Sequence, residues 1–271
     1  MRMKKLLLLL IATVLLTSFG CGSKDRNQAD TVLNKVQQNI QVELNHLDQD
    51  LAGAAKKLSG LDPADPLIRS VLSELLVNRP YAVDSCTIDP TGKMLAIEPS
   101  AYSEYEGSDI SQQEQVIRLF QTQQPVLSQS FRAVEGFDAA AIEYPIFSSN
   151  NEVVGAVSVL FKPEALLGNI ISPAVQGTPF YIWAMQTNGR VLYDIDTNQV
   201  GKNLFVDPLY QPYTQLISLS REIAAKKSGK GYYEFIDYQS QQVVRKKTLW
   251  DSVELHGTEW RLVLIQVVSK T

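Results

Sequence analysis

The sequence predicts an α+β protein in which a long N-terminal helix precedes two similar modules, each an antiparallel sheet with flanking helices. Two observations lead to this prediction. An apolar stripe with helical spacing begins at Leu33, and one order of strands, turns and a helix then occurs twice, over residues 79–175 and 176–271. The short apolar runs in these two ranges are bounded by Gly, Pro, Asn and Asp, which is typical of strands.

The first twenty residues have the three-part layout of a secretory signal. The basic start MRMKK precedes the apolar run LLLLLIATVLL, and TSFG then leads into Cys21. This run is short for a membrane-spanning helix, which needs about 20 residues. The step Gly20-Cys21 resembles the lipobox of prokaryotic lipoproteins, although Ser18 stands where that motif favours leucine.

We therefore expect residues 1–20 to be a signal peptide and residues 21–30 to be a lipidated Cys21 with a polar tether. The alternative is an uncleaved anchor, or an ordinary cleaved signal with an incidental cysteine. Lipidation would leave Cys86 as the only thiol, so no intramolecular disulfide could form. Cys86 lies in the strand-like run YAVDSCTID, where a small buried side chain is expected.

Composition and motifs exclude several classes of function. The chain has 25 basic and 29 acidic residues, a net charge of −4 and no basic patch, so nucleic acid is not an expected partner. The only histidines, His46 and His256, lie in no nucleophile or metal motif, and no nucleotide-binding glycine pattern is present. We therefore expect no enzymatic activity, no metal and no cofactor.

Residues 31–78 are predicted to form the long N-terminal helix and a shorter second helix. The apolar stripe has heptad-like spacing. Its members are Leu33, Val36, Ile40, Leu44, Leu47, Leu51, Ala54 and Leu58. We expect the stripe to pack on the sheets of the same chain, with pairing in a homodimer as the alternative. Ser59-Gly60 ends this helix, and the second helix is expected from Pro66 to Asn78.

The first module, residues 79–175, begins with the strand YAVDSCTID, the turn Pro90-Thr91-Gly92 and the strand KMLAIEP. A helix is predicted over SDISQQEQVIRLFQTQQ, with Ser108 or Asp109 as its cap. Three strands, VLSQSFRAV, AAAIEYPIF and VVGAVSVLF, and a connecting helix, KPEALLGNIISPAV, complete the module.

The second module, residues 176–271, repeats this order. It begins with the strand FYIWAMQ, a turn ending in Gly189 and the strand RVLYDI. A helix is predicted over YTQLISLSREIAAKKS, and it is followed by the strands GYYEFIDY, VVRKKTLWDSV and WRLVLIQVV. Asp194 and Asp196 in the loop after RVLYDI are interpreted as turn caps or solvated side chains. The repeat is clear in element order and weak at the level of individual residues.

This order, with the residues that carry it, resembles the extracellular double Cache sensor domain, a tandem of PAS-like modules on a long helix. Three segments carry the resemblance: TIDPTGKMLAIEPSAYSEYEGSDIS, IEYPIFSSNNEVVGAVSVLF, and MQTNGRVLYDIDTNQVGKNLF with the later GTEWRLVLI. It covers about residues 30–268. The resemblance implies that the first module is membrane-distal and that the second is membrane-proximal.

The resemblance also implies a sensor that binds a small molecule, a polar organic metabolite, within residues 81–165. The best-known subfamily holds amino acids through an Arg-x-Trp-Tyr run and an Asp in the last strand of the module. Here QQEQVIR and GAVSVLF stand at those places. The usual clamp for an α-amino and α-carboxyl group is therefore absent.

An anionic ligand needs buried or half-buried donors, and the fork of an arginine side chain matches a carboxylate, so we expect the ligand-binding residues to include arginines. The candidates are Arg118, Arg132, Tyr102, Tyr105, Tyr144, Asp138, Gln112 and Gln113. The alternative interpretation is a solvated helix position for Arg118, packing for the tyrosines and a loop cap for Asp138.

The sequence thus predicts a lipid-anchored extracytoplasmic sensor, at the outer face of a cell membrane, that acts through a membrane receptor or transporter. A protein of a different class is the alternative: a ligand-free structural or interaction lipoprotein that dimerises or binds a partner through the long helix.

Overall fold

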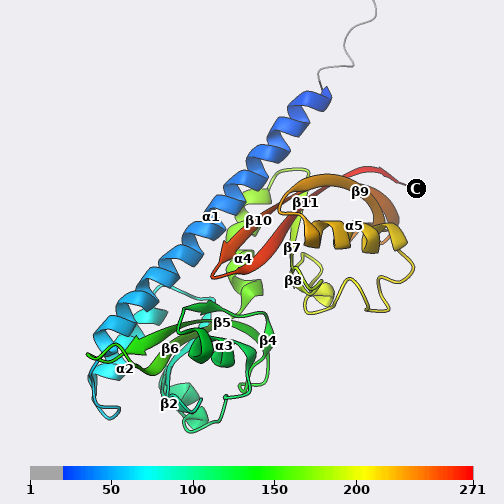
Figure 1. Cartoon of the computed structure of the whole chain (residues 1–271). Coiled ribbons are helices and arrows are strands. Elements are labelled where there is room, and N and C mark those ends of the chain that lie inside the picture. The colour runs from blue at the N-terminus through cyan, green and yellow to red at the C-terminus, as the bar shows by residue number, and fades with distance from the viewer. Residues whose placement is uncertain (1–20, 271) are drawn as a thin grey trace, which may run out of the picture.

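The computed structural model describes residues 21–270, so the expected signal peptide lies outside the described residues. The long helix α1, Cys21–Leu58, runs beside both modules (Figure 1). It begins at Cys21, and the polar residues 22–30 that were expected to form a tether are its first turns. A polar composition does not end a helix that is already nucleated by packing further along, since each added residue gains a backbone hydrogen bond. Thr31 Oγ1 also donates to the Asn27 carbonyl oxygen (2.7 Å) in this stretch.

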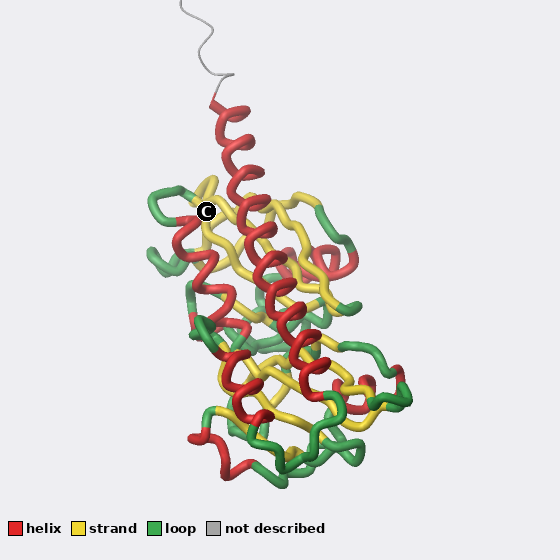
Figure 2. The backbone as a smooth tube through the Cα atoms, turned by 90° about the vertical axis from the view of Figure 1, so that its left-hand side faces the viewer, coloured by secondary structure: helices red, strands yellow, loops and turns green. Residues whose placement is uncertain are grey.

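The apolar stripe of α1 packs on the sheets of the same chain, as expected. Each of its eight predicted members is at most 5% exposed and belongs to one core with residues of both sheets. The helix crosses in front of strands of both modules (Figure 2). The stripe is therefore covered and does not offer a surface for pairing with a second copy.

The first module contains a six-stranded sheet in the order β2-β1-β6-β5-β3, with β4 paired to β5. All the pairings are antiparallel. The strands are β1 Ala82–Ile88, β2 Met94–Glu98, β3 Val126–Leu127, β4 Phe131–Arg132, β5 Asp138–Phe147 and β6 Val153–Phe161.

The second module contains a five-stranded antiparallel sheet in the order β8-β7-β11-β10-β9, which repeats the order of the first sheet. The strands are β7 Phe180–Gln186, β8 Val191–Tyr193, β9 Gly229–Ile236, β10 Val243–Leu255 and β11 Thr258–Lys270. The turns before β2 and β8 also match, because Gly92 and Gly189 both have positive φ, 85° and 90°. The predicted α+β class and the duplicated unit are confirmed.

The shorter helices lie on opposite faces of the sheets. They are α2 Leu67–Leu76, α3 Glu114–Thr122, α4 Pro163–Val175, α5 Thr214–Ala225, and the 3-10 helices η1 Ser100–Tyr105 and η2 Thr197–Gln199. The helices α1, α2 and α4 share one continuous core with the two sheets. The helices α3 and α5 pack in separate cores on the other faces of the sheets. The loops beside α3 and α5 are thus placed to enclose cavities on those faces.

Two elements of the first module differ from the expectation. The helix α3 begins at Glu114 rather than after Ser108 or Asp109, because Asp109 instead accepts a hydrogen bond from the Ser111 backbone N–H (2.9 Å) in a turn. The predicted strand VLSQSFRAV forms only the short pieces β3 and β4. Between them Ser128 Oγ accepts from the Ala141 backbone N–H (2.8 Å), so a side chain replaces a backbone group of the ladder.

Candidate functional site

A small cavity lies in the first module, between the sheet and the segments that cover it. Its volume, about 20 Å³, exceeds the 10–15 Å³ that one water molecule needs. The floor comes from β1, β5 and β6, and the cover comes from the segments around residues 110–115 and 131–135. The lining residues are Asp84, Cys86, Met94, Ile110, Gln113, Gln115, Phe131, Val134, Glu135, Ala141, Glu143, Ser158 and Leu160.

Two buried carboxyl groups dominate the floor of this cavity. Asp84 is 1% exposed and Glu143 is 2% exposed. One oxygen of each, Asp84 Oδ2 and Glu143 Oε2, has no hydrogen-bond partner within the part of the chain that the structure describes. Because an unpaired buried polar group is costly, each of these oxygens needs a partner such as a water molecule, an ion or a ligand.

Strand alternation explains why both carboxyl groups share the cavity. Side chains two residues apart in a strand lie on one face, so Glu143 on β5 lies on the same face as Ala141, and Asp84 on β1 on the same face as Cys86. The register places Ser158 on β6 between them, paired with Glu143 on one side and with Cys86 on the other. The three central strands therefore present carboxyl, hydroxyl and thiol groups side by side.

The surroundings favour the protonated forms of both acids. Burial, aided by the charge of Glu135, raises the pKa of Asp84 to about 8. Burial also raises the pKa of Glu143 to about 8, with Arg118 opposing the shift and Glu114 adding to it. A cation in the cavity would favour the ionised forms, since an opposite charge lowers a carboxyl pKa.

Two glutamines form the polar part of the cover. Gln115 is buried, and its Nε2 donates to Gln113 Oε1 (2.6 Å). The amide groups thus lie over the carboxyl floor on the first turn of α3, where they can contribute both donors and acceptors.

Of the predicted ligand-binding residues, Gln113 lines this cavity. Arg118 does not line it, because its guanidinium donates to the Leu127 carbonyl oxygen (2.6 Å) and its Nε lies 3.5 Å from Glu114 Oε1. Arg132 on β4 is exposed. Side chains alternate between the two faces of a strand, and on β4 the neighbouring Phe131 is the residue that lines the cavity. The structure therefore brings neither arginine to the cavity.

The remaining predicted residues lie elsewhere. Tyr102 and Tyr105 pack together on η1, with ring centroids 6.4 Å apart, at the edge of the α3 core. Tyr144 lies on the opposite face of β5 from Glu143 and contacts α1. Asp138 pairs with Arg190 of the second module (2.5 Å). Gln112 Nε2 donates to the neighbouring Ser111 Oγ (3.3 Å).

Sequence reasoning missed the carboxyl groups of the floor, although a signal was present. Asp84 interrupts the apolar run YAVDSCTID, and Glu143 interrupts AAAIEYPIF. A lone acidic residue in the middle of a strand that is otherwise buried has to lie inside the fold. Such a residue is almost never fully buried unless it is paired.

Within residues 21–270, no helix is long and apolar enough to cross a membrane. The same part of the chain contains no group of three or more His, Cys, Asp and Glu side chains that could hold a metal ion.

One known protein family matches part of the chain. The family described as "HK/GC/Chemotaxis protein-like, sensor domain" matches residues 42–163, which contain the cavity. This part of the chain is similar to the sensor domains that the family describes. None of the curated proteins compared with the chain matches it.

Solved structures extend the similarity over both modules. An extracellular ligand-binding receptor from Desulfohalobium retbaense is 34% identical, with a TM-score of 0.74; the alignment covers 88% of this chain and 40% of that one. The chain thus spans less than half the length of that receptor.

Two more distant structures share the fold. The periplasmic sensory domain of the Campylobacter jejuni chemoreceptor Tlp1 is 15% identical (TM-score 0.60; 90% and 96% covered). The ligand-binding domain of the Pseudomonas aeruginosa amino-acid chemoreceptor PctC, in complex with GABA, is 18% identical (TM-score 0.63; 89% and 99% covered). The sensor fold expected from the double Cache resemblance is confirmed.

Proposed function

We propose that the chain is an extracytoplasmic sensor module that binds a small primary amine, as its ammonium cation, in the first-module cavity. The observation that carries the proposal is the pair of buried carboxyl groups, Asp84 and Glu143, each with an unpartnered oxygen on the same cavity. An ammonium group supplies the donors that these oxygens lack and the charge that stabilises their ionised forms.

This proposal replaces the anionic ligand for which Arg118 and Arg132 were chosen. Neither guanidinium lines the cavity, whereas Glu135 adds a third acidic group to its wall. GABA, the ligand of the PctC structure, also has an ammonium group. Its carboxylate would find no arginine in this cavity, so an amine without a carboxylate fits better.

Lipidation of Cys21 remains part of the proposal, with binding passed to a membrane receptor or transporter. The start of α1 and the end of β11 both lie on the side of the molecule away from the first module (Figure 1). An anchor on Cys21 would therefore hold the first module far from the membrane surface. Mass spectrometry of the mature N-terminus tests this part: we expect a lipid-modified Cys21, and a mass that retains residues 1–20 would contradict it.

A thermal-shift comparison tests the ligand class. The protein is heated with methylamine or ethylamine, and separately with acetate or propionate. A ligand at 100 times its dissociation constant adds about 2.7 kcal/mol of stability, so we expect a rise in Tm with at least one amine. The rise should disappear in Glu143→Gln and persist in Glu152→Gln, a control at an exposed carboxylate of the β5–β6 turn. A rise with the carboxylic acids alone would contradict the proposal.

A further inference from the structure

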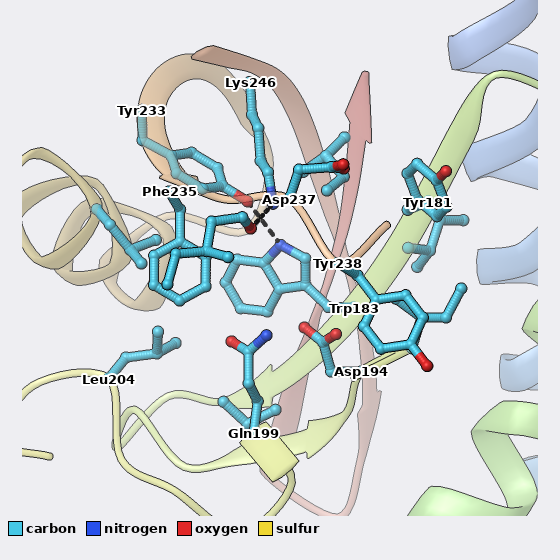
Figure 3. A pocket seen from close by; sticks show the side chains of 16 residues that line it. Tyr181, Trp183, Asp194, Gln199, Leu204, Tyr233, Phe235, Asp237, Tyr238 and Lys246 are labelled. Atoms are coloured by element: carbon cyan, nitrogen blue, oxygen red, sulfur yellow. Dashed lines mark hydrogen bonds between the residues drawn. The ribbon is translucent and has the colours of Figure 1, made fainter. Parts of the chain in front are cut away.

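The second module contains a cavity of its own, lined mainly by aromatic side chains (Figure 3). It lies between β7, β9 and β10 and the loop after β8, and its volume is about 40 Å³. This is several times the 10–15 Å³ that a single water molecule needs, and it suits a ligand of a few heavy atoms. The walls include Trp183, Tyr233, Phe235 and Tyr238.

Charged groups of both signs border these aromatic walls. Asp194, Asp237 and Lys246 line the cavity, so two carboxylates face one ammonium group. Asp194 and Gln199 lie on one side of the Trp183 indole, and Tyr233 and Lys246 lie on the other (Figure 3). The net charge of the three ionisable groups is negative when all are ionised, which favours a cationic ligand.

One cation already borders the cavity: burial lowers the pKa of Lys246, and the carboxylates of Asp194 and Asp237 oppose that shift. Lys246 Nζ lies 5.4 Å from the centroid of the Phe235 ring and donates to the Ile236 carbonyl oxygen (2.8 Å). The faces of Trp and Tyr rings attract cations in the same way, and they do so without a hydrogen bond.

Most polar groups around the cavity are engaged within the protein. Trp183 Nε1 donates to the Tyr233 hydroxyl (3.3 Å), and Asp194 Oδ1 accepts from the Asp196 backbone N–H (2.8 Å). Gln199 Oε1 accepts from the Tyr210 hydroxyl (3.3 Å). A ligand rich in N–H donors therefore gains little here, in contrast to the carboxyl floor of the first module.

We propose that this cavity is a second ligand site, and that it takes a small methylated ammonium cation against Trp183 and Tyr238, with Asp194 as the counter-ion. Methyl groups fill an aromatic cavity and need no hydrogen-bond acceptor, while the charge is balanced by the carboxylate. Asp194, interpreted from the sequence as a turn or loop residue, thus has a binding role; its neighbour Asp196 does cap η2 through the Asn198 backbone N–H (3.2 Å).

Calorimetric titration of the purified protein with tetramethylammonium and with choline tests the proposal. The neutral carbon isostere of choline, 3,3-dimethyl-1-butanol, is titrated for comparison. Both cations should bind, and the neutral isostere should bind about tenfold more weakly, since it keeps the shape and loses the charge.

Variants locate the site. Tyr238→Ala and Asp194→Asn should each weaken binding of the cations by about tenfold. Tyr232→Ala is the matched control, because Tyr232 is as exposed as Tyr238 (52% and 49%) and lies on β9 outside the cavity. Glu143→Gln, in the other module, should leave this binding unchanged.

Three outcomes would overturn the inference. They are no binding of either cation by the wild type, equal effects of Tyr238→Ala and Tyr232→Ala, and loss of binding in Glu143→Gln alone. The last result would place the cation in the first-module cavity. Because the amine test in the first module uses ligands with N–H donors, either site can fail without the other.

Discussion

Tyr144 on β5 donates its hydroxyl to Asp48 on α1 across 2.8 Å. The same Asp48 oxygen is in contact with Nε2 of His256, which occupies the turn between β10 and β11 in the left-handed conformation (φ 48°). One carboxylate of the long helix therefore joins the first module to the second. The contact thus links the first-module sheet, α1 and the β10–β11 turn of the second module.

We call the contacts of Asp48 with Tyr144 and His256 the junction, and its removal should destabilise the protein. Tyr144→Phe loses one hydrogen bond, which is worth about 1 kcal/mol. Asp48→Ala leaves two partners without an acceptor and should cost about 1–3 kcal/mol. Urea unfolding followed by circular dichroism measures both changes.

The matched control for the junction is Lys57→Ala, since the ion pair of Lys57 with Glu74 is highly exposed (57% and 59%). Exposed pairs contribute little, so the change in the free energy of unfolding should stay within about 0.5 kcal/mol. A junction variant as stable as this control would show that the contact does not hold the modules together.

Two glycines should respond to alanine in opposite directions. Gly92 has a φ of 85°, and a Cβ there would lie 2.5 Å from Ser111 Cα, in the loop that leads to the glutamine cover. Gly92→Ala should therefore destabilise the protein and weaken binding of the amine. Gly53 lies within α1 with open space around it, so Gly53→Ala should stabilise by about 0.5–1 kcal/mol. Thermal unfolding of the two variants checks the signs, and stabilisation by Gly92→Ala would contradict this account of the turn.

The buried acids predict how stability depends on pH. Asp84 and Glu143 have folded-state pKa values of about 8, well above the value of about 4 of an unfolded chain. Between about pH 4 and 8 the folded protein thus binds more protons than the unfolded one. Through these groups the free energy of unfolding should fall as the pH rises across that window.

Glu143→Gln isolates this effect. The charged groups that act on Glu143 are Arg118 and Glu114, and Glu135 acts on Asp84. The variant leaves those neighbours in place, so its stability should fall less steeply from pH 4 to 8 than that of the wild type. Urea midpoints measured at several pH values give the two slopes, and equal slopes would mean that Glu143 does not titrate in this window.

The fold could be predicted from the sequence where local pattern and global packing agree. The apolar stripe from Leu33 to Leu58 predicted one buried helix face. The repeated order of elements predicted two similar sheets, and the two sheets do have the same strand order. The predicted start of α3 was wrong because an aspartate such as Asp109 can either cap a helix or close a turn. Contact with the segment that leads into β2 decides between these two roles. A bridge between Lys93 and Asp109 holds the turn.

The site was harder to predict because its residues come from strands far apart in the sequence. The sequence predicts arginine ligands for a carboxylate. In the fold, however, the Arg118 guanidinium donates to the Leu127 carbonyl oxygen and is thereby held away from the cavity. Glu143 and Tyr144 are adjacent in the sequence but lie on opposite faces of β5. The register of β1, β6 and β5 then brings Asp84 and Glu143 to one cavity, and the sequence alone does not give that register.

The central claim, that Asp84 and Glu143 are counter-ions for an ammonium ligand, is tested most directly by calorimetric titration with methylamine. The titration is run near pH 7 in two buffers of different ionisation enthalpy, with the wild type and Glu143→Gln. We predict binding with release of protons, because the cation converts carboxyl groups of pKa about 8 to carboxylates. In Glu143→Gln the affinity should fall by about tenfold or more. Binding without proton release, at equal affinity in both proteins, would contradict the claim.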